Sequence, residues 1–240
     1  MIISTVGCSF TYAQQQGWPV MLANMLNAEL KNHGHPGAGN TYIGNKVILE
    51  SHCEKPDLVV IMWSGLTRKD ISVDHSDPVL MQVLAEYKDY VRWGGVNTSY
   101  ILSGGIQGSW QHHPATRTIF DSLYKYSNER TMAQDSLLQM ISTQNYLKQR
   151  NIRYLMSSYV NYWGTDKQVA QLDYGIGQFS DLRYLVDQID FSRWVFADNR
   201  DCIYELAKRN NDLQEDGFHP DFKTHADWAN LLMAKLQTDN

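Results

Sequence analysis

The sequence predicts an α/β fold in which a central parallel β-sheet lies between two layers of helices. Residues 2–6 form a short β-branched run and residues 58–62 a strictly apolar one, and both are typical of buried strands. A run that is apolar at every position fits a central parallel strand covered by helices on both faces. Segments with apolar residues at helical spacing alternate with these runs, which favours a parallel sheet. We therefore expect residues 1–240 to form one three-layer α/β/α domain.

The N-terminal elements are predicted from glycine and proline residues that mark turns, loops and helix starts. The strand over 2–6 is expected to meet a turn at Gly7. Pro19 favours the start of a helix, because proline in a first helical turn has a suitable φ and lacks an N–H that would stay unpaired there. Residues 33–40 are rich in glycine and are predicted to be a loop, followed by a helix from about 41 to 52.

After an irregular stretch, the later part of the chain continues the alternation of strands and helices. The pattern predicts a helix over about 128–148, a strand over 152–157 and a helix over about 222–236. The stretch from about 74 to 127 does not fit, because it mixes glycines with aromatic residues. We interpret it as an insertion after the third strand. Ligands of open α/β sheets bind outside the carboxyl ends of the strands, so we expect the insertion to overhang that site.

Composition excludes several classes of protein. The net charge is −5, with 21 Lys and Arg against 26 Asp and Glu, which argues against binding to nucleic acid phosphates. The longest apolar run, Leu58–Trp63, is much shorter than the roughly 20 residues that span a membrane. The N-terminus has no signal-peptide pattern, and the cysteine spacing fits neither disulfides nor zinc. We expect a cytoplasmic protein that binds neither nucleic acid nor membrane; its oligomeric state is left open.

A serine follows the first predicted strand, in the segment Gly7-Cys8-Ser9-Phe10-Thr11. A serine at a strand-to-helix turn is exposed at the sheet edge and surrounded by backbone N–H groups, as an attacking hydroxyl requires. Alone, this segment is better explained by Ser9 as a helix or turn cap. Cys8 is a second candidate nucleophile, although a free cysteine is usually a small buried apolar side chain.

Two further segments lie at predicted loop-to-helix junctions. Residues 37–41, Gly-Ala-Gly-Asn-Thr, place glycines and backbone N–H groups at a helix start, where negative charge is stabilised; a plain tight turn is the alternative. Asp216 and His219 lie in the loop before the last helix, where Pro220 disfavours helical backbone. An aspartate there can accept the histidine Nδ1–H and leave Nε2 free to act as a base.

In order and placement, the three segments together resemble the SGNH (GDSL-type) hydrolase superfamily. That family has a serine motif after the first strand, a glycine after the second, Gly-x-Asn after the third and Asp-x-x-His-Pro before the last helix. The resemblance covers about residues 1–70 and 150–236 and implies a flavodoxin-like sandwich. It implies Ser9 as nucleophile, Asp216 and His219 as the other triad members, and the N–H groups of Ser9 and Gly39 as oxyanion donors.

The third family motif is altered in this chain. Trp63–Thr67 stands where Gly-x-Asn is expected, and an ungapped match places Leu66 at the asparagine. The third oxyanion donor is therefore either absent or supplied by Ser64 or Thr67. Asn40 and Arg68 are candidate substrate contacts, Arg68 as a cationic donor.

The resemblance implies a serine esterase or O-deacetylase that acts on a small acyl ester, with a glycan ester among the candidate substrates. The alternative is a catalytically weak or inactive module that binds carbohydrate or protein on the same scaffold. Aromatic residues, several of them in the insertion, are candidate sugar contacts or ordinary core residues: Trp93, Tyr100, Trp110, Tyr124, Tyr126, Tyr162 and Trp163.

The histidines outside the predicted triad give little support for a metal site. His33, His35, His112, His113 and His225 have no carboxylate or cysteine at ligand spacing in the sequence. We favour surface or packing roles for them and expect no metal and no cofactor.

Overall fold

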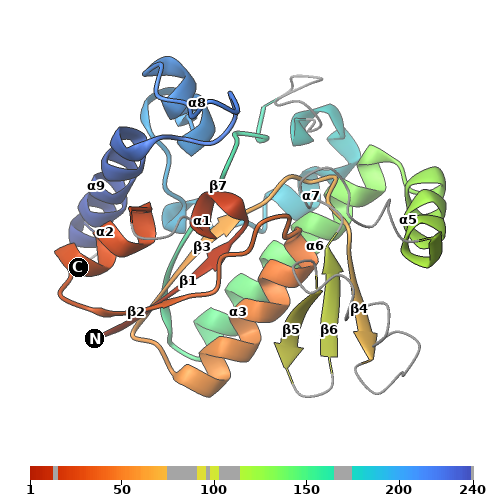
Figure 1. Cartoon of the computed structure of the whole chain (residues 1–240), viewed down its shortest axis with the longest axis horizontal. Helices are drawn as coiled ribbons and strands as arrows, with labels where there is room; N and C mark the ends of the chain where they lie inside the picture. The colour runs from red at the N-terminus through yellow and green to blue at the C-terminus, as the bar shows by residue number, and fades with distance from the viewer. Residues whose placement is uncertain (13–15, 75–90, 96–97, 103–113, 165–174, 239–240) are drawn as a thin grey trace.

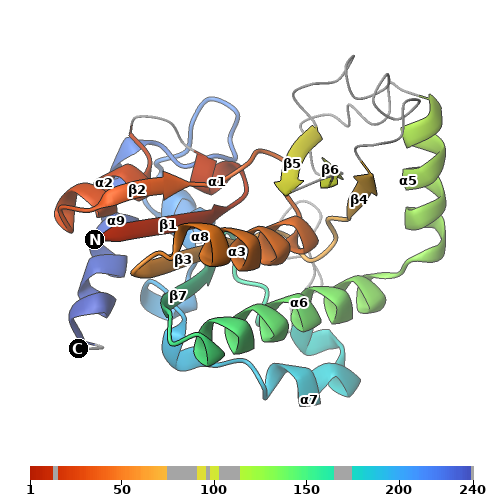
Figure 2. The same cartoon turned by 90° about the horizontal axis from the view of Figure 1, so that it is seen from below.

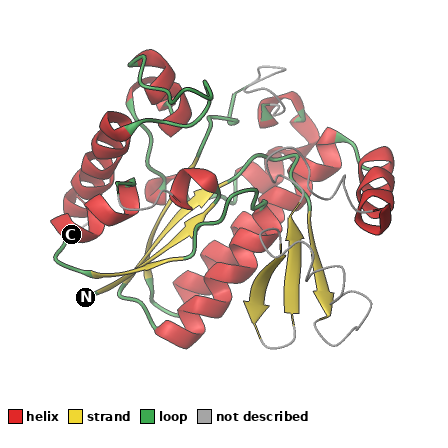
Figure 3. Cartoon of the chain, in the orientation of Figure 1, coloured by secondary structure: helices red, strands yellow, loops and turns green. Residues whose placement is uncertain are grey.

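The computed structural model describes residues 1–12, 16–74, 91–95, 98–102, 114–164 and 175–238. These residues form an α/β structure with two separate sheets, one parallel and one antiparallel (Figure 1; Figure 3, yellow). The predicted fold class is confirmed.

The main sheet is parallel and has the order β2-β1-β3-β7. Its strands are β1 (Ile2–Gly7), β2 (Glu29–Asn32), β3 (Leu58–Trp63) and β7 (Arg153–Ser158). All six residues of β3 are buried, as its unbroken apolar pattern requires. Beyond β7, Trp194 makes a single parallel bridge to Met156, which extends the sheet by one residue.

Helices cover both faces of the main sheet (Figure 1). On one side lie α2 (Trp18–Met25), α8 (Ile203–Arg209) and α9 (Phe222–Thr238), and on the other lie α3 (Asn40–Glu54) and α6 (Glu129–Gln149). Pro19 occupies the first turn of α2, as expected. The shorter helices are α1 (Ser9–Tyr12) and α7 (Arg183–Val186), with 3₁₀ turns at Ile176–Gln178, Ser180–Leu182, Phe191–Arg193 and Asp198–Arg200.

The segment between β3 and α6 forms a second sheet and a helix. Strands β4 (Asp70–Asp74), β5 (Val91–Gly95) and β6 (Thr98–Leu102) pair antiparallel in the order β4-β6-β5, and α5 (Pro114–Tyr126) follows. Figure 2 shows this unit at one end of α3, away from the main sheet. Tyr100 joins it to α3, because its hydroxyl accepts a hydrogen bond from Asn45 Nδ2 (2.8 Å) and its ring packs on Tyr42.

Several elements and one boundary differ from the sequence prediction. Strand β2 was not predicted, because Glu29–Asn32 has no apolar alternation and lies at the sheet edge. Helix α8 was not predicted either. The second sheet begins at Asp70, earlier than the expected insertion boundary. Among the described residues, no helix is both long and apolar enough to span a bilayer.

Candidate active site

Ser9 is the first residue of α1, directly after β1. The turn is tight, because Thr11 and Tyr12 both donate their N–H groups to the carbonyl of Cys8. Gly7 is required before it, since a Cβ at this position would lie 2.2 Å from Thr11 Oγ1. Ser9 is left partly exposed, whereas Cys8 is fully buried and therefore better placed for packing than for attack.

Asp216 and His219 lie in the loop that precedes α9. Asp216 Oδ1 accepts the backbone N–H groups of Phe218 and His219, each at 2.9 Å, so the carboxylate organises its own loop. Gly217 has a φ of 67°, a left-handed conformation that glycine adopts without the Cβ penalty. The loop thereby directs the imidazole back toward β1.

The structure brings the three residues of the expected triad together. His219 Nδ1 lies 2.5 Å from Asp216 Oδ2, and His219 Nε2 lies 2.8 Å from Ser9 Oγ. An ionised carboxylate can only accept, so Nδ1 carries the proton and Nε2 accepts from the serine hydroxyl. This is the geometry that a base needs to withdraw the proton of an attacking serine.

Hydrogen bonds keep the Asp216 carboxylate ionised. Partial loss of water would raise its pKa, but the bonds from the His219 side chain and from the backbone N–H groups of His219 and Phe218 outweigh this and hold the pKa below its ordinary value. Aromatic rings fix the imidazole from the other side: the His219 ring lies 5.1 Å from the Phe10 ring and 5.3 Å from that of Phe218.

Gly39, the expected second oxyanion donor, is the N-cap residue of α3. In the structure its N–H donates to Asp70 Oδ1 at 2.9 Å, and the N–H of Tyr42 donates to Asp70 Oδ2 at the same distance. Asp70 therefore caps α3 from the start of β4. Burial raises the pKa of Asp70 to about 6, although these two N–H groups and the charges of Arg68 and Lys69 act in the opposite direction. Sequence reasoning missed this residue.

Asn40, a candidate substrate contact, is 2% exposed and connects the start of α3 to the loop after β3 and to α6. Its Oδ1 accepts the Ser64 N–H at 2.8 Å, and its Nδ2 donates to Ser136 Oγ at 3.1 Å and to the carbonyl of Ser64 at 3.3 Å. The side chain thus anchors the loop after β3 rather than facing outward. Ser64 and Leu66 are also buried, at 0% and 2% exposure, so neither presents its side chain to solvent.

Arg68 and Thr67 remain partly exposed. Arg68 Nη1 donates to the carbonyl of Ala38 at 3.3 Å, next to Gly39, and its guanidinium lies 5.7 Å from the ring centre of Tyr159. Tyr159 in turn packs on Phe10, 4.9 Å between ring centres, so contacts link the Arg68 cation to the Ser9 turn. The carbonyl of Thr67 accepts the Tyr124 hydroxyl of α5 at 3.2 Å.

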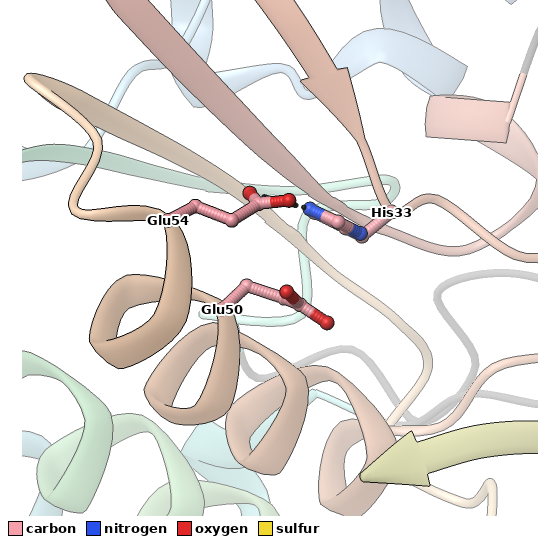
Figure 4. Close-up of side chains that lie close together, drawn as sticks. All are labelled: His33, Glu50 and Glu54. Carbon is pink, nitrogen blue, oxygen red and sulfur yellow. Dashed lines mark hydrogen bonds and ion pairs between the residues drawn. The ribbon is translucent and has the colours of Figure 1, made fainter.

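His33 has carboxylate neighbours that its sequence spacing did not indicate, so that part of our expectation was wrong. Figure 4 shows its imidazole directed at Glu54, with Glu50 one turn earlier on α3. His33 Nε2 and Glu54 Oε2 are 3.0 Å apart, and the ligand atoms of His33, Glu50 and Glu54 lie within 4.8 Å of one another. Lys46 already pairs with Glu50 at 2.5 Å, so this ion pair and the hydrogen bond between His33 and Glu54 account for the cluster.

The remaining candidates lie elsewhere. His225 is buried in α9, and its Nδ1 accepts the Trp18 N–H at 3.4 Å, which is a packing role. Tyr100 and Tyr162 are core residues, at 5% and 0% exposure, and not a sugar platform. Tyr126 is 80% exposed on α5. His112, His113, Trp110 and the side chain of Trp93 fall outside the described residues.

The fold can be compared with solved structures. The esterase EstA from Pseudoalteromonas sp. matches with a TM-score of 0.51 at 12% identity, over 99% of this chain and 97% of EstA. TesA matches with a TM-score of 0.50 at 14% identity, over 99% of each chain. A catalytic mutant of Axe2, an acetylxylan esterase from Geobacillus stearothermophilus, matches with a TM-score of 0.50 at 12% identity, over 98% of this chain and 93% of Axe2.

The chain has the SGNH (GDSL-type) hydrolase fold. Identity this low shows shared architecture and does not transfer chemistry. At the level of sequence, the chain belongs to the family described as "Family of unknown function (DUF6071)", whose model matches residues 4–238. No curated protein matches it.

Proposed function

We propose that this protein is a serine hydrolase, an esterase or O-deacetylase that cleaves a small acyl ester. The observation that carries the proposal is the continuous hydrogen-bond chain from Ser9 Oγ through His219 to Asp216. Three residues of the required types, in the required order of contact, arise from the two ends of the sequence, which a capping serine alone would not explain.

The reaction follows from the hydrogen-bond directions. Ser9 Oγ attacks the acyl carbon and passes its proton to His219 Nε2, which becomes an imidazolium stabilised by Asp216. The tetrahedral intermediate collapses, and Nε2 returns the proton to the departing alcohol oxygen. Water then attacks the acyl-enzyme, gives a proton to Nε2, and Ser9 leaves with that proton restored. Each step moves protons through side chains already in contact, so no cofactor takes part.

Arg68 supports the developing negative charge in this proposal. Its guanidinium lies between the Ala38 carbonyl and the Tyr159 ring, and a fixed cation stabilises an oxyanion in a partly dehydrated site. Thr67, which lies inside the altered third motif, is a further partly exposed side chain that carries a donor.

A fluorophosphonate probe tests the proposal, because it labels only an activated serine. The wild type is expected to be labelled, Ser9→Ala to be unlabelled, and Ser192→Ala, a remote serine on the surface, to be labelled like the wild type. A folded wild type that stays unlabelled between pH 5 and 8.5 would contradict a hydrolase. Activity on p-nitrophenyl acetate and on acetylated xylan, the substrate named for Axe2, then separates a general esterase from a glycan deacetylase.

A binding module of low turnover is the second candidate. It is favoured by the engagement of the Gly39 N–H with Asp70 and by the buried Leu66 at the expected asparagine position. Binding of xylo-oligosaccharides by calorimetry, with Ser9→Ala equal to the wild type and no ester turnover, would support it over the hydrolase.

A further inference from the structure

Asp70 holds its carboxylate against the Gly39 N–H, the backbone group that the proposed reaction needs as an oxyanion donor. Oδ1 and Oδ2 each accept one N–H of the α3 start, from Gly39 and Tyr42. The fit is close: a Cβ on Gly39 would lie 2.7 Å from Asp70 Oδ2, so only glycine leaves room for this carboxylate. The contact therefore requires both the Asp70 carboxylate and a glycine at position 39.

The loop that carries Gly39 lies directly against the Ser9 turn. The His35 N–H donates to the carbonyl of Gly7 at 2.9 Å, and a Cβ on Gly34 would lie 2.7 Å from the backbone nitrogen of Tyr12. Because the carboxyl ends of parallel strands share one edge of a sheet, Ser9 and the Gly39 N–H belong to the same edge.

We propose that Asp70 controls the proposed hydrolytic site by competing, as a carboxylate, with the acyl oxygen for the Gly39 N–H. This inference rests on the serine hydrolase proposed above. An ionised Asp70 holds the donor and repels the oxyanion that forms in the transition state. A protonated Asp70 releases the N–H, ends the repulsion, and offers its own O–H as a donor.

The surroundings place this protonation in mild acid. Burial raises the pKa of Asp70 to about 6. The charges that face it are Arg68 and Lys69 on its own segment, and Lys69 is partly neutralised by an ion pair with Asp135 on α6. From α3 it receives only the two backbone N–H groups, and from β6 it faces the phenol of Tyr100, whose pKa is raised mainly by burial.

The consequence is a specific pH profile. His219 must be uncharged to accept the serine proton. If turnover also requires protonated Asp70, kcat of the wild type falls about tenfold per pH unit above about 6.

The test is Asp70→Asn, which keeps the shape, removes the charge and supplies an amide donor. The control is Asp57→Asn, the same change at a carboxylate that accepts the Ile2 N–H at 2.7 Å, near the opposite end of the sheet. With p-nitrophenyl acetate from pH 5 to 8.5, Asp70→Asn should lose the alkaline decline. At pH 8 its kcat should exceed that of the wild type by up to about 100-fold, with KM little changed. Asp57→Asn should follow the wild type.

Fluorophosphonate labelling distinguishes a failure of the Asp70 inference from a failure of the serine hydrolase proposal. If Ser9 is labelled but Asp70→Asn keeps the wild-type pH profile, Asp70 does not control the site and the hydrolase stands. If Asp70→Asn fails to fold, the labelling rate of the wild type decides: a rate that is level from pH 6 to 8 overturns the inference, and a tenfold decline per unit supports it. Absence of labelling in both proteins at every pH overturns the inference together with the hydrolase.

Discussion

His219 Nε2 lies 2.8 Å from Ser9 Oγ, although 210 positions separate the two residues in the chain. Ser9 begins α1, which follows β1, and His219 precedes α9, which packs on α2. The contact therefore exists only when β1 and the helical layer that contains α2 and α9 have assembled. Activation of the serine depends on this tertiary packing and not on a local motif.

Ser9→Ala and His219→Ala are each expected to lower kcat/KM for p-nitrophenyl acetate by about 10⁴-fold or more. The double variant should be little worse than either single variant, because each removes the same proton transfer. Steady-state kinetics on the three proteins measure this. Losses that multiply in the double variant would mean that the two residues act separately.

Cys8→Ala addresses the thiol as an alternative nucleophile. Cys8 is fully buried, so its loss should cost about 1 kcal/mol of stability and leave most activity in place. Loss of activity equal to that of Ser9→Ala in a folded protein would favour the thiol instead.

The sequence was informative where structure is local. The apolar run of β3 predicted a covered central strand, and the short motifs around Ser9 and His219 predicted the turns that expose them. Asp70 was missed because its bond to Gly39 crosses 31 positions and no local pattern marks an aspartate that caps a distant helix. The Glu54 partner of His33 was missed for the same reason, since a strand end and a helix end meet only in the fold.

Asn40→Ala should destabilise the protein by about 2–3 kcal/mol, because it leaves the buried Ser64 N–H without its acceptor and removes the amide that donates to the Ser136 hydroxyl. Urea unfolding measures the loss. Asn45→Ala is the matched control, because Asn45 makes one partly buried bond to Tyr100 and should cost less. Equal losses of unfolding free energy would show that the Asn40 hydrogen bonds stabilise the protein no more than the Asn45 bond does.

Leu66→Asn restores the residue type that an ungapped family match expects, yet it should not raise kcat. The Leu66 side chain is 2% exposed, so the amide would enter the core and cost about 2–4 kcal/mol. Leu66→Met, which nearly conserves volume, should cost less than about 1.5 kcal/mol. A stable Leu66→Asn variant with faster turnover would show that this position does reach the oxyanion.

Arg68→Gln should lower kcat by roughly 10-fold or more, because it removes the cation beside Ala38 and Tyr159. Arg68→Lys should recover part of the loss, since it keeps the charge without the planar guanidinium. Arg183→Gln is the control, because its exposed guanidinium pairs with Asp187 at the end of α7. An effect confined to KM would assign Arg68 to ground-state binding of substrate instead.

His225 predicts a specific loss of stability in acid. Burial lowers its pKa from 6.5 to about 4, only partly offset by the charges of Asp212 and Asp221. Between pH 6.5 and 4 the unfolded chain therefore binds a proton that the folded chain does not bind. The free energy of unfolding is full above pH 6.5 and declines as the pH falls toward 4, by on the order of 3 kcal/mol. Asp70, with its raised pKa, has the opposite sign, since its penalty is absent in acid and grows as the pH rises through about 6.

Comparing variants isolates the His225 contribution. His225→Gln can still accept the Trp18 N–H but does not titrate, so the difference in unfolding free energy between wild type and variant should shrink from pH 7 to pH 4.5. The control is His52→Gln, at an exposed histidine of α3, and its unfolding free energy should follow that of the wild type at each pH. If urea unfolding gives His225→Gln the same acid dependence as the wild type, the imidazole is protonated in the folded protein and its burial in α9 does not keep it neutral.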